Sequence, residues 1–367
     1  MNKLDPRVIY EDLHQIPELG FAEFKTAAYL ADKLEALGYK VTRNVGGTGV
    51  IGEIKGAEPG PVMLVRADMD ALPFLIDGEQ KSIHACGHDA HSSMLLAAAA
   101  ELVGKIKRGT LRILFQQAEE TLKGALAVID AGVIKDVDIA LGLHVRPVQD
   151  IPFGELSPAV RHAASTFVNI TITGLSSHGA RPHLGVNAIE AAAVAISAIG
   201  AIKINPIIPW SCKVTGIKGG GVAPNIIPDK VEMIVDARAQ TNDAMTELLE
   251  KLRCAVTNAA AAVGATAEIS TPGGVIPAAE YDEALTAEVA ECIVEVVGKE
   301  KLAKELVNPG GEDFHYFVNK YPHIKAAYFG VGAAATPGLH HPDMHINKEA
   351  LPSGTAVLVK MVERKLG

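Results

Sequence analysis

The stretch VMLVRAD, at residues 62–68, consists of consecutive apolar side chains followed by a polar end. Because its apolar residues do not alternate with polar ones, it indicates a strand that is buried on both faces of a sheet. Three more runs of this type follow along the chain: LRILFQQ (111–117), IALGLHV (139–145) and KAAYFGVG (325–332). Helical patterns precede or separate them, at 22–37 before Gly38, at 90–107 and at 123–131. This alternation predicts an α/β fold with a mostly parallel sheet covered by helices.

Residues 165–275 have a different pattern from the chain on either side. TFVNITITG (166–174) alternates as a half-buried strand, and a helical pattern follows at 187–202. Two more strand patterns flank GIKGGGVAPN, which lacks the Gly-Lys-Ser/Thr of a phosphate loop and is therefore interpreted as a hairpin. A second helical pattern begins at Asp243, and the α/β pattern then resumes. The predicted organisation is a discontinuous catalytic domain, 1–164 with 276–367, and an inserted satellite domain, 165–275.

Length, composition and charge narrow the classes of function. The chain has 367 residues, 48% of them hydrophobic, which favours two domains. The formal net charge is -9 and no long Lys/Arg run occurs, so a surface for nucleic acid or for an anionic membrane is not expected. No signal-like or membrane-spanning apolar segment is recognised, so a cytoplasmic protein with a small soluble substrate is expected. The four irregularly spaced cysteines indicate reduced thiols.

The sequence IHACGHDAHSSMLLAAAAE, at residues 83–101, places several metal-binding side chains before an apolar helix. Cys86 and His88 are two residues apart, which suits a loop that Gly87 allows to turn before a helix starting near Ala90. A thiolate and an imidazole are good ligands for zinc, manganese or a similar ion. A buried cysteine beside helix-capping residues is the structural alternative. A zinc deaminase is excluded, because its Pro-Cys-x-x-Cys motif is absent.

Further polar groups follow the other predicted strands. Glu119 and Glu120 emerge from an apolar run, so one can bind a metal while the other holds a proton. Two glutamates at a solvated helix start are the alternative. His144 and His340 also follow predicted strands or lie in turns, although a single histidine of this kind more often belongs to the core. Because carboxyl ends of parallel strands meet at one edge, these groups together favour a metal site there.

Seven motifs in one order give the chain a family resemblance. They are RADMDALP (66–73), HACGHDAH (84–91), QQAEE (116–120), GLHV (142–145), SSHGARPHLGVNAIEAA (176–192), GGEDF (310–314) and LHHP (339–342). Their combination resembles the dinuclear metallopeptidases of the aminoacylase and carboxypeptidase type. The resemblance is greatest to the amidohydrolase branch, with hippurate hydrolase and indole-acetyl-amino-acid hydrolase. It implies a phosphorylase/hydrolase-like α/β domain and a ferredoxin-like α+β satellite domain that forms a homodimer.

The resemblance also implies roles for individual residues. Two divalent ions (Zn, Mn, Co or Ni) would be held by five ligands, with Cys86 as the expected bridge: Cys86, His88, Glu120, His144 and His340. Glu119 would be the general base acting on a water that the metals activate, and His178 would stabilise the oxyanion. Asp68 and Asp70 would support the ligands. Asn225 and Arg238 would bind a substrate carboxylate.

The predicted activity is metal-dependent hydrolysis of the amide bond in N-acyl amino acids with acetyl, benzoyl or aryl-acetyl groups. A dipeptidase or carboxypeptidase of the same family is the alternative. A non-catalytic metal-binding module is an alternative from another class, but such a module would not need Glu119. Two departures from the family concern the substrate pocket and a turn. The link FLIDGEQKSI (74–83) is short, and Gln117 replaces a proline that many relatives carry.

Overall fold

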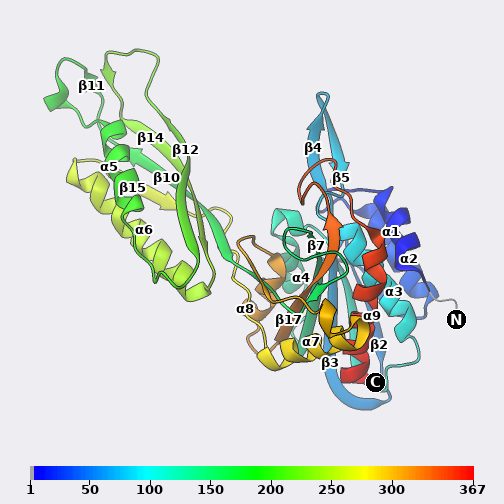
Figure 1. The fold of residues 1–367 in the computed structure, drawn as a ribbon. Coiled ribbons are helices and arrows are strands. Elements are labelled where there is room, and N and C mark those ends of the chain that lie inside the picture. Colours follow the sequence, from blue (N-terminus) through cyan, green and yellow to red (C-terminus); the bar gives the residue numbers. More distant parts are fainter. Residues whose placement is uncertain (1–3) are drawn as a thin grey trace. The chain divides into compact units, whose positions relative to one another are not determined.

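A computed structural model describes residues 4–367 (Figure 1). The chain divides into two compact units. The first unit consists of Met1–Arg161, Glu280–Val307 and Glu312–Gly367. The second unit consists of His162–Ala279 with Asn308–Gly311, so the segment 165–275 lies within it. None of the helices in the described residues combines the length and apolarity that crossing a membrane requires.

A seven-stranded mixed sheet forms the centre of the first unit. Its strands, in spatial order, are β1 (Lys40–Val45), β2 (Gly49–Lys55), β6 (Arg108–Gln116), β3 (Glu58–Asp68), β7 (Ile139–Pro147), β17 (Lys325–Ala335) and β8 (Leu156–Ser157). The middle four are parallel to one another. Strands β1, β2 and β8 pair antiparallel at the two edges. The predicted α/β fold with a mostly parallel sheet is therefore confirmed.

Helices cover this sheet on both sides. They are α1 (Pro6–His14), α2 (Phe24–Ala36), α3 (His88–Leu102), α4 (Gly124–Asp130), α7 (Glu283–Val297), α8 (Tyr316–Lys320) and α9 (Leu351–Leu366). In Figure 1, α4 and α8 lie on the side of the sheet opposite to α1, α2, α3 and α9. Nearly every residue of α3 is buried, which explains why its apolar residues show no one-sided stripe. The fully buried Leu and Ala side chains of α3 pack with β3, β6 and β7 in the main core.

The sequence pattern placed the start of α3 two residues late and its end five residues late. The helix begins at His88, because Gly87 before it has left-handed backbone angles, and it stops at Leu102, because Val103 after it has extended backbone angles with ψ 123.

The short link 74–83 forms most of a hairpin made of strands β4 (Leu72–Ile76) and β5 (Glu79–Ile83). Its turn residues, Asp77 and Gly78, both have positive φ, as a type I′ hairpin requires.

The second unit has its own four-stranded antiparallel sheet. Its strands, in spatial order, are β12 (Trp210–Gly219), β14 (Lys230–Ala239), β10 (Ala164–Thr173) and β15 (Thr266–Ser270). Helices α5 (Ala188–Gly200) and α6 (Asn242–Ala262) pack together on one face of it. The chain order βαββαβ with this strand arrangement is the ferredoxin-like α+β architecture that was predicted. The remaining short strands are β9 (Val160–His162), β11 (Ser177–His178), β13 (Ile226–Ile227) and β16 (Leu306–Asn308).

Candidate metal centre

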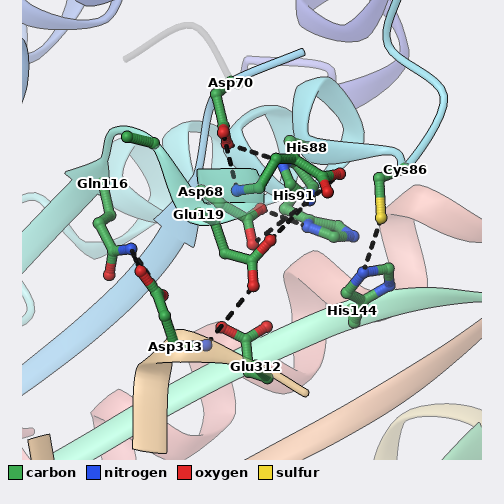
Figure 2. Close-up of polar contacts among 12 residues, drawn as sticks. Asp68, Asp70, Cys86, His88, His91, Gln116, Glu119, His144, Glu312 and Asp313 are labelled. Carbon is green, nitrogen blue, oxygen red and sulfur yellow. Dashed lines mark hydrogen bonds and ion pairs between the residues drawn. The ribbon is translucent and has the colours of Figure 1, made fainter. Parts of the chain in front are cut away.

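The predicted site residues of the first unit gather at the carboxyl ends of its parallel strands. Asp68 is the last residue of β3, and His144 lies near the end of β7. Glu119 and Glu120 form the short 3-10 helix η1 (Glu119–Thr121) that follows β6. His340 lies in the loop after β17, where its amide donates a hydrogen bond to the Ala85 carbonyl at 2.6 Å. Parallel alignment therefore explains how residues that are far apart in sequence meet here (Figure 2).

Cys86 is brought to the site by a turn that only glycine fits. Gly87 has φ +86, and a Cβ at this position would lie 2.4 Å from Val145 Cγ2 on the neighbouring strand. The turn places the Cys86 sulfur 3.4 Å from His144 Nε2. It also starts α3, so that His88 is the first residue of the helix. The two residues of the Cys-x-His pair thus reach the same site from a loop and from a helix end.

Hydrogen bonds fix which ring nitrogen each buried histidine presents. His88 Nδ1 lies 2.9 Å from Asp70 Oδ1, and its Nε2 is buried without a hydrogen-bond partner. His144 Nδ1 donates to the Val145 carbonyl at 2.5 Å, which leaves its Nε2 as an acceptor facing the Cys86 sulfur. Both imidazoles are therefore held at Nδ1 and turn Nε2 toward the site, as metal-binding histidines held by a second hydrogen bond do.

The donor atoms of the five predicted ligands form two groups that share Cys86. Cys86, His88 and His144 make one triad, and Cys86, Glu120 and His340 make another, with all donor atoms of each triad within 4.8 Å of one another. Glu120 Oε1 lies 3.5 Å from His340 Nε2 and 3.7 Å from His88 Nε2. Like His88 Nε2, this oxygen is buried without a hydrogen-bond partner. A thiol, imidazoles and a carboxylate with unsatisfied atoms facing one point fit a soft divalent cation.

Burial shifts the pKa values of three potential ligands away from their charged forms. Burial raises the pKa of the Cys86 thiol well above its usual range. Burial likewise raises the pKa of the Glu120 carboxyl to about 7. Burial lowers the pKa of His144 well below its usual value. A bound cation would stabilise the thiolate, the carboxylate and the neutral imidazole together, since these are the forms that bind metal.

His91 belongs to the same histidine-rich run but has no free ring nitrogen. Its Nδ1 lies 2.5 Å from Asp68 Oδ1, and its Nε2 accepts the Val145 amide at 2.9 Å. The second bond makes Nε2 the acceptor, so Nδ1 carries the proton and donates to Asp68. His91 therefore orients Asp68 and the end of β7. This role could not be predicted from the sequence, because the bond to Val145 depends on how α3 packs on the sheet.

Glu119 lies at the edge of the donor groups. Its Oε2 is 3.9 Å from His88 Nε2, and its Oε1 accepts a long hydrogen bond, 3.5 Å, from the Asp313 amide. Burial and the nearby carboxylates of Glu312 and Glu120 raise the pKa of Glu119 well above its usual range. A carboxylate whose surroundings favour the protonated form can take a proton and hold it.

Arg66 and Asp313 form a buried ion pair beside the site, and neither residue was assigned a role from the sequence. Arg66 is fully buried and donates to Asp68 Oδ2 and Asp313 Oδ1, both at 2.8 Å. Asp313 also accepts hydrogen bonds from Gln116 Nε2 and from the Ala125 amide. The motifs RADMD and GGEDF that contain the two residues were visible, but their contact joins positions 247 residues apart.

The other three predicted site residues belong to the second unit. His178 and Asn225 are neighbours, because His178 pairs with Ile226 and the Gly179 amide donates to the Asn225 carbonyl at 2.7 Å. Both side chains are exposed. Arg238 lies on β14, where its Nε donates to Asp236 Oδ1 at 2.9 Å and its Nη1 to the Pro309 carbonyl at 2.9 Å.

Comparison with known proteins gives the family. Residues 64–364 match the model of peptidase family M20/M25/M40. The chain is 32% identical to IAA-amino acid hydrolase ILR1-like 2 of Arabidopsis thaliana, over 98% of this chain and 84% of that protein. It is 31% identical to N-acetyl-L-cysteine deacetylase of Bacillus subtilis, over 98% of this chain and 87% of that protein.

A solved structure agrees in fold. The YXEP protein of Bacillus subtilis, described as a dinuclear metal binding peptidase from the M20 family, superposes with a TM-score of 0.82. It is 29% identical to this chain, and the match covers 98% of this chain and 97% of that one. The chain therefore belongs to peptidase family M20, in its amidohydrolase branch, and is a hydrolase that acts on C–N bonds.

Proposed function

We propose that the protein is a metal-dependent amidohydrolase that splits an N-acyl amino acid into a carboxylic acid and a free amino acid. The observation that carries this proposal is the pair of donor triads sharing Cys86, with the carboxylate of Glu119 beside them. Two relatives are named for removal of an acyl group from an amino acid or for hydrolysis of an amino acid conjugate, which supports this class of substrate. Five residues would hold two divalent ions: Cys86, His88, Glu120, His144 and His340.

The bound ions would act as Lewis acids that lower the pKa of water and polarise the amide carbonyl. Glu119 takes the proton of the attacking water and delivers it to the nitrogen of the leaving amino acid. Its Oε1 is oriented by the Asp313 amide at 3.5 Å, which leaves Oε2 for the proton. Asp70 orients His88 through the bond to Nδ1 and also accepts the Glu120 amide at 2.9 Å, so one carboxylate positions two ligands.

His178 supplies a hydrogen-bond donor to the oxygen that becomes negative during the reaction. The Ala180 amide donates to His178 Nδ1 at 3.0 Å, so in the neutral ring the proton is on Nε2. An exposed Nε2–H is the form that can donate to an oxyanion. In Arg238, Nη1 donates one hydrogen to the Pro309 carbonyl and Nη2 donates one to Asp236 Oδ2. Each of these nitrogens has a second N–H, and the two together can bind a substrate carboxylate. The Asn225 amide, next to the His178 turn, is a second group for that carboxylate.

A screen of substrates with metal-reconstituted protein tests the proposal. The protein is loaded in turn with zinc, manganese, cobalt or nickel and assayed on acetyl, benzoyl and aryl-acetyl amino acids and on dipeptides. We expect kcat/KM to be highest for one of the N-acyl amino acids. A strong preference for dipeptides would replace the proposal with a peptidase. Tight metal binding without any hydrolysis above background would indicate the non-catalytic alternative.

A further inference from the structure

The turn that carries Glu119 and Glu120 begins with a residue in the left-handed conformation. Ala118 has φ 54 and ψ 36 and joins the end of β6 to η1. Such backbone angles are unfavourable for a residue with a side chain, and they persist where the surroundings hold them. This conformation turns the chain sharply between the buried strand and the two glutamates. A change at Ala118 toward the right-handed region would therefore displace the Glu119 carboxylate.

Glu23 holds this turn through a buried hydrogen bond. Its Oε1 accepts the Ala118 amide at 2.8 Å, and its Oε2 accepts the Thr48 hydroxyl at 2.5 Å. The Glu23 side chain is 0% exposed, so water cannot replace it as the acceptor. Without this acceptor the buried Ala118 amide would lose its hydrogen bond, which destabilises the turn that the bond holds.

The segment around Glu23 also packs against the same turn. A Cβ on Gly20 would lie 3.0 Å from both Ala118 Cα and Thr121 Cγ2, so the backbone of this segment is in direct contact with the turn. Glu18 belongs to the segment as well, but its carboxylate accepts the Lys25 and Thr26 amides at the start of α2. Glu18 and Glu23 thus belong to one segment but bind different backbone amides: Glu18 binds those at the start of α2, and Glu23 binds that of Ala118.

We propose that Glu23 is a positioning residue for the reaction, acting through the Ala118 amide to fix the direction in which Glu119 leaves the strand. The inference rests on the proposed role of Glu119 as the general base. The Ala118 amide needs only an acceptor at Oε1, which a neutral side chain can also supply. Glutamine can accept the Ala118 amide with its carbonyl oxygen and turn its NH2 toward Thr48.

Four variants of the metal-loaded protein test this role. Glu23→Ala removes the acceptor and is expected to lower kcat about 10- to 100-fold, since small displacements of a catalytic group have effects of that size. KM should stay within about twofold, because Glu23 does not face the substrate. Glu23→Gln should keep kcat within about threefold. Thr48→Val keeps the volume of the side chain but removes the hydroxyl that donates to Glu23, so its kcat should lie between those of the wild type and Glu23→Ala. This variant tests the same role if Glu23→Ala does not fold.

Glu18→Ala is the matched control, because it loosens the same segment without removing the bond to Ala118. A kcat loss in Glu18→Ala equal to that in Glu23→Ala, at matched thermal stability, would overturn the proposal. So would an inactive Glu23→Gln, or an unchanged kcat in Glu23→Ala. Visible spectra of the cobalt-loaded variants give a readout that needs no substrate, because Glu120 lies in the same turn. The spectrum should change in Glu23→Ala and not in Glu18→Ala. If the wild type hydrolysed none of the N-acyl amino acids, the proposed function would fail and this spectral comparison would still decide whether Glu23 holds the turn.

Discussion

Glu119 and Glu120 are neighbours in sequence with different surroundings, and a single substitution separates their roles. Glu119→Gln keeps the shape of the side chain and an oxygen for the Asp313 amide, but it cannot take a proton. We expect kcat to fall about 10²- to 10⁴-fold while metal content, measured by elemental analysis, and thermal stability stay unchanged. Normal turnover in this variant would remove Glu119 from the role of base.

Cys86 is the residue that the two donor triads share, so its replacement should affect metal binding most. In Cys86→Ser, we expect metal content after dialysis to fall, because a hydroxyl is a far poorer anionic ligand than a thiolate. Cys292→Ser is the control, since Cys292 is buried in α7 among residues of the main core. Retention of both ions by Cys86→Ser, in the same dialysis that leaves Cys292→Ser loaded, would contradict the assignment of Cys86 as a ligand.

At the scale of elements, α1 is joined to the start of α3 by a bond that depends on pH. His14 Nδ1 lies 2.6 Å from Asp89 Oδ2, and this hydrogen bond raises the pKa of His14 above its usual 6.5. Because the pKa is raised by folding, the stabilisation is complete below pH 6.5 and disappears as the pH rises through the folded value. The His14 side chain is 37% exposed, so solvent screening limits the effect to about 0.5 to 1 kcal/mol.

Denaturant unfolding of the metal-free protein checks this prediction. The difference in free energy of unfolding between the wild type and His14→Gln should be larger at pH 6 than at pH 8.5. An equal difference at both pH values would show that the bond does not titrate. Metal-free protein is needed because binding of an ion at the neighbouring His88 has its own pH dependence.

Some strands of the fold could be predicted from the sequence, and others could not. The four apolar runs became β3, β6, β7 and β17, since a strand buried on both faces has a pattern that no surface element shares. The β4–β5 hairpin was missed although Asp77-Gly78 is a strong turn signal, because LPFLI is apolar throughout and EQKSI is polar up to its last residue, so neither strand alternates in sequence.

In the candidate site too, some residues could be predicted from the sequence and others could not. Its potential ligands are Cys, His and Glu residues, which are recognisable in a sequence as metal-binding types. Because the carboxyl ends of parallel strands meet at one edge of a sheet, their meeting could also be predicted. Arg66, His91 and Glu23 were assigned no role from the sequence, because each acts through buried hydrogen bonds to residues distant in the chain. Periodicity and spacing carry no information on such contacts.

At the scale of the whole molecule, the second unit leaves apolar surface uncovered. Helices α5 and α6 occupy one face of its sheet, and on strands β10 and β14 the opposite face carries Phe167, 57% exposed, and Ile234, 46% exposed. Strand β12 lies at the sheet edge, and Ile189 of α5 is 45% exposed. Unpaired edges and apolar patches of this type are commonly covered by a second copy of the chain. We therefore predict a homodimer formed through the second unit.

A homodimer raises the question of whether His178 serves its own chain or the partner, and mixing two inactive variants answers it. Glu119→Gln chains keep His178, and His178→Ala chains keep Glu119. If His178 acts in trans, each mixed dimer has one complete site, and random exchange should restore about a quarter of wild-type activity. Sedimentation and differential tagging must show that mixed dimers form. Absence of recovered activity in such dimers, or full activity of a monomer, would mean that His178 acts within its own chain or not at all.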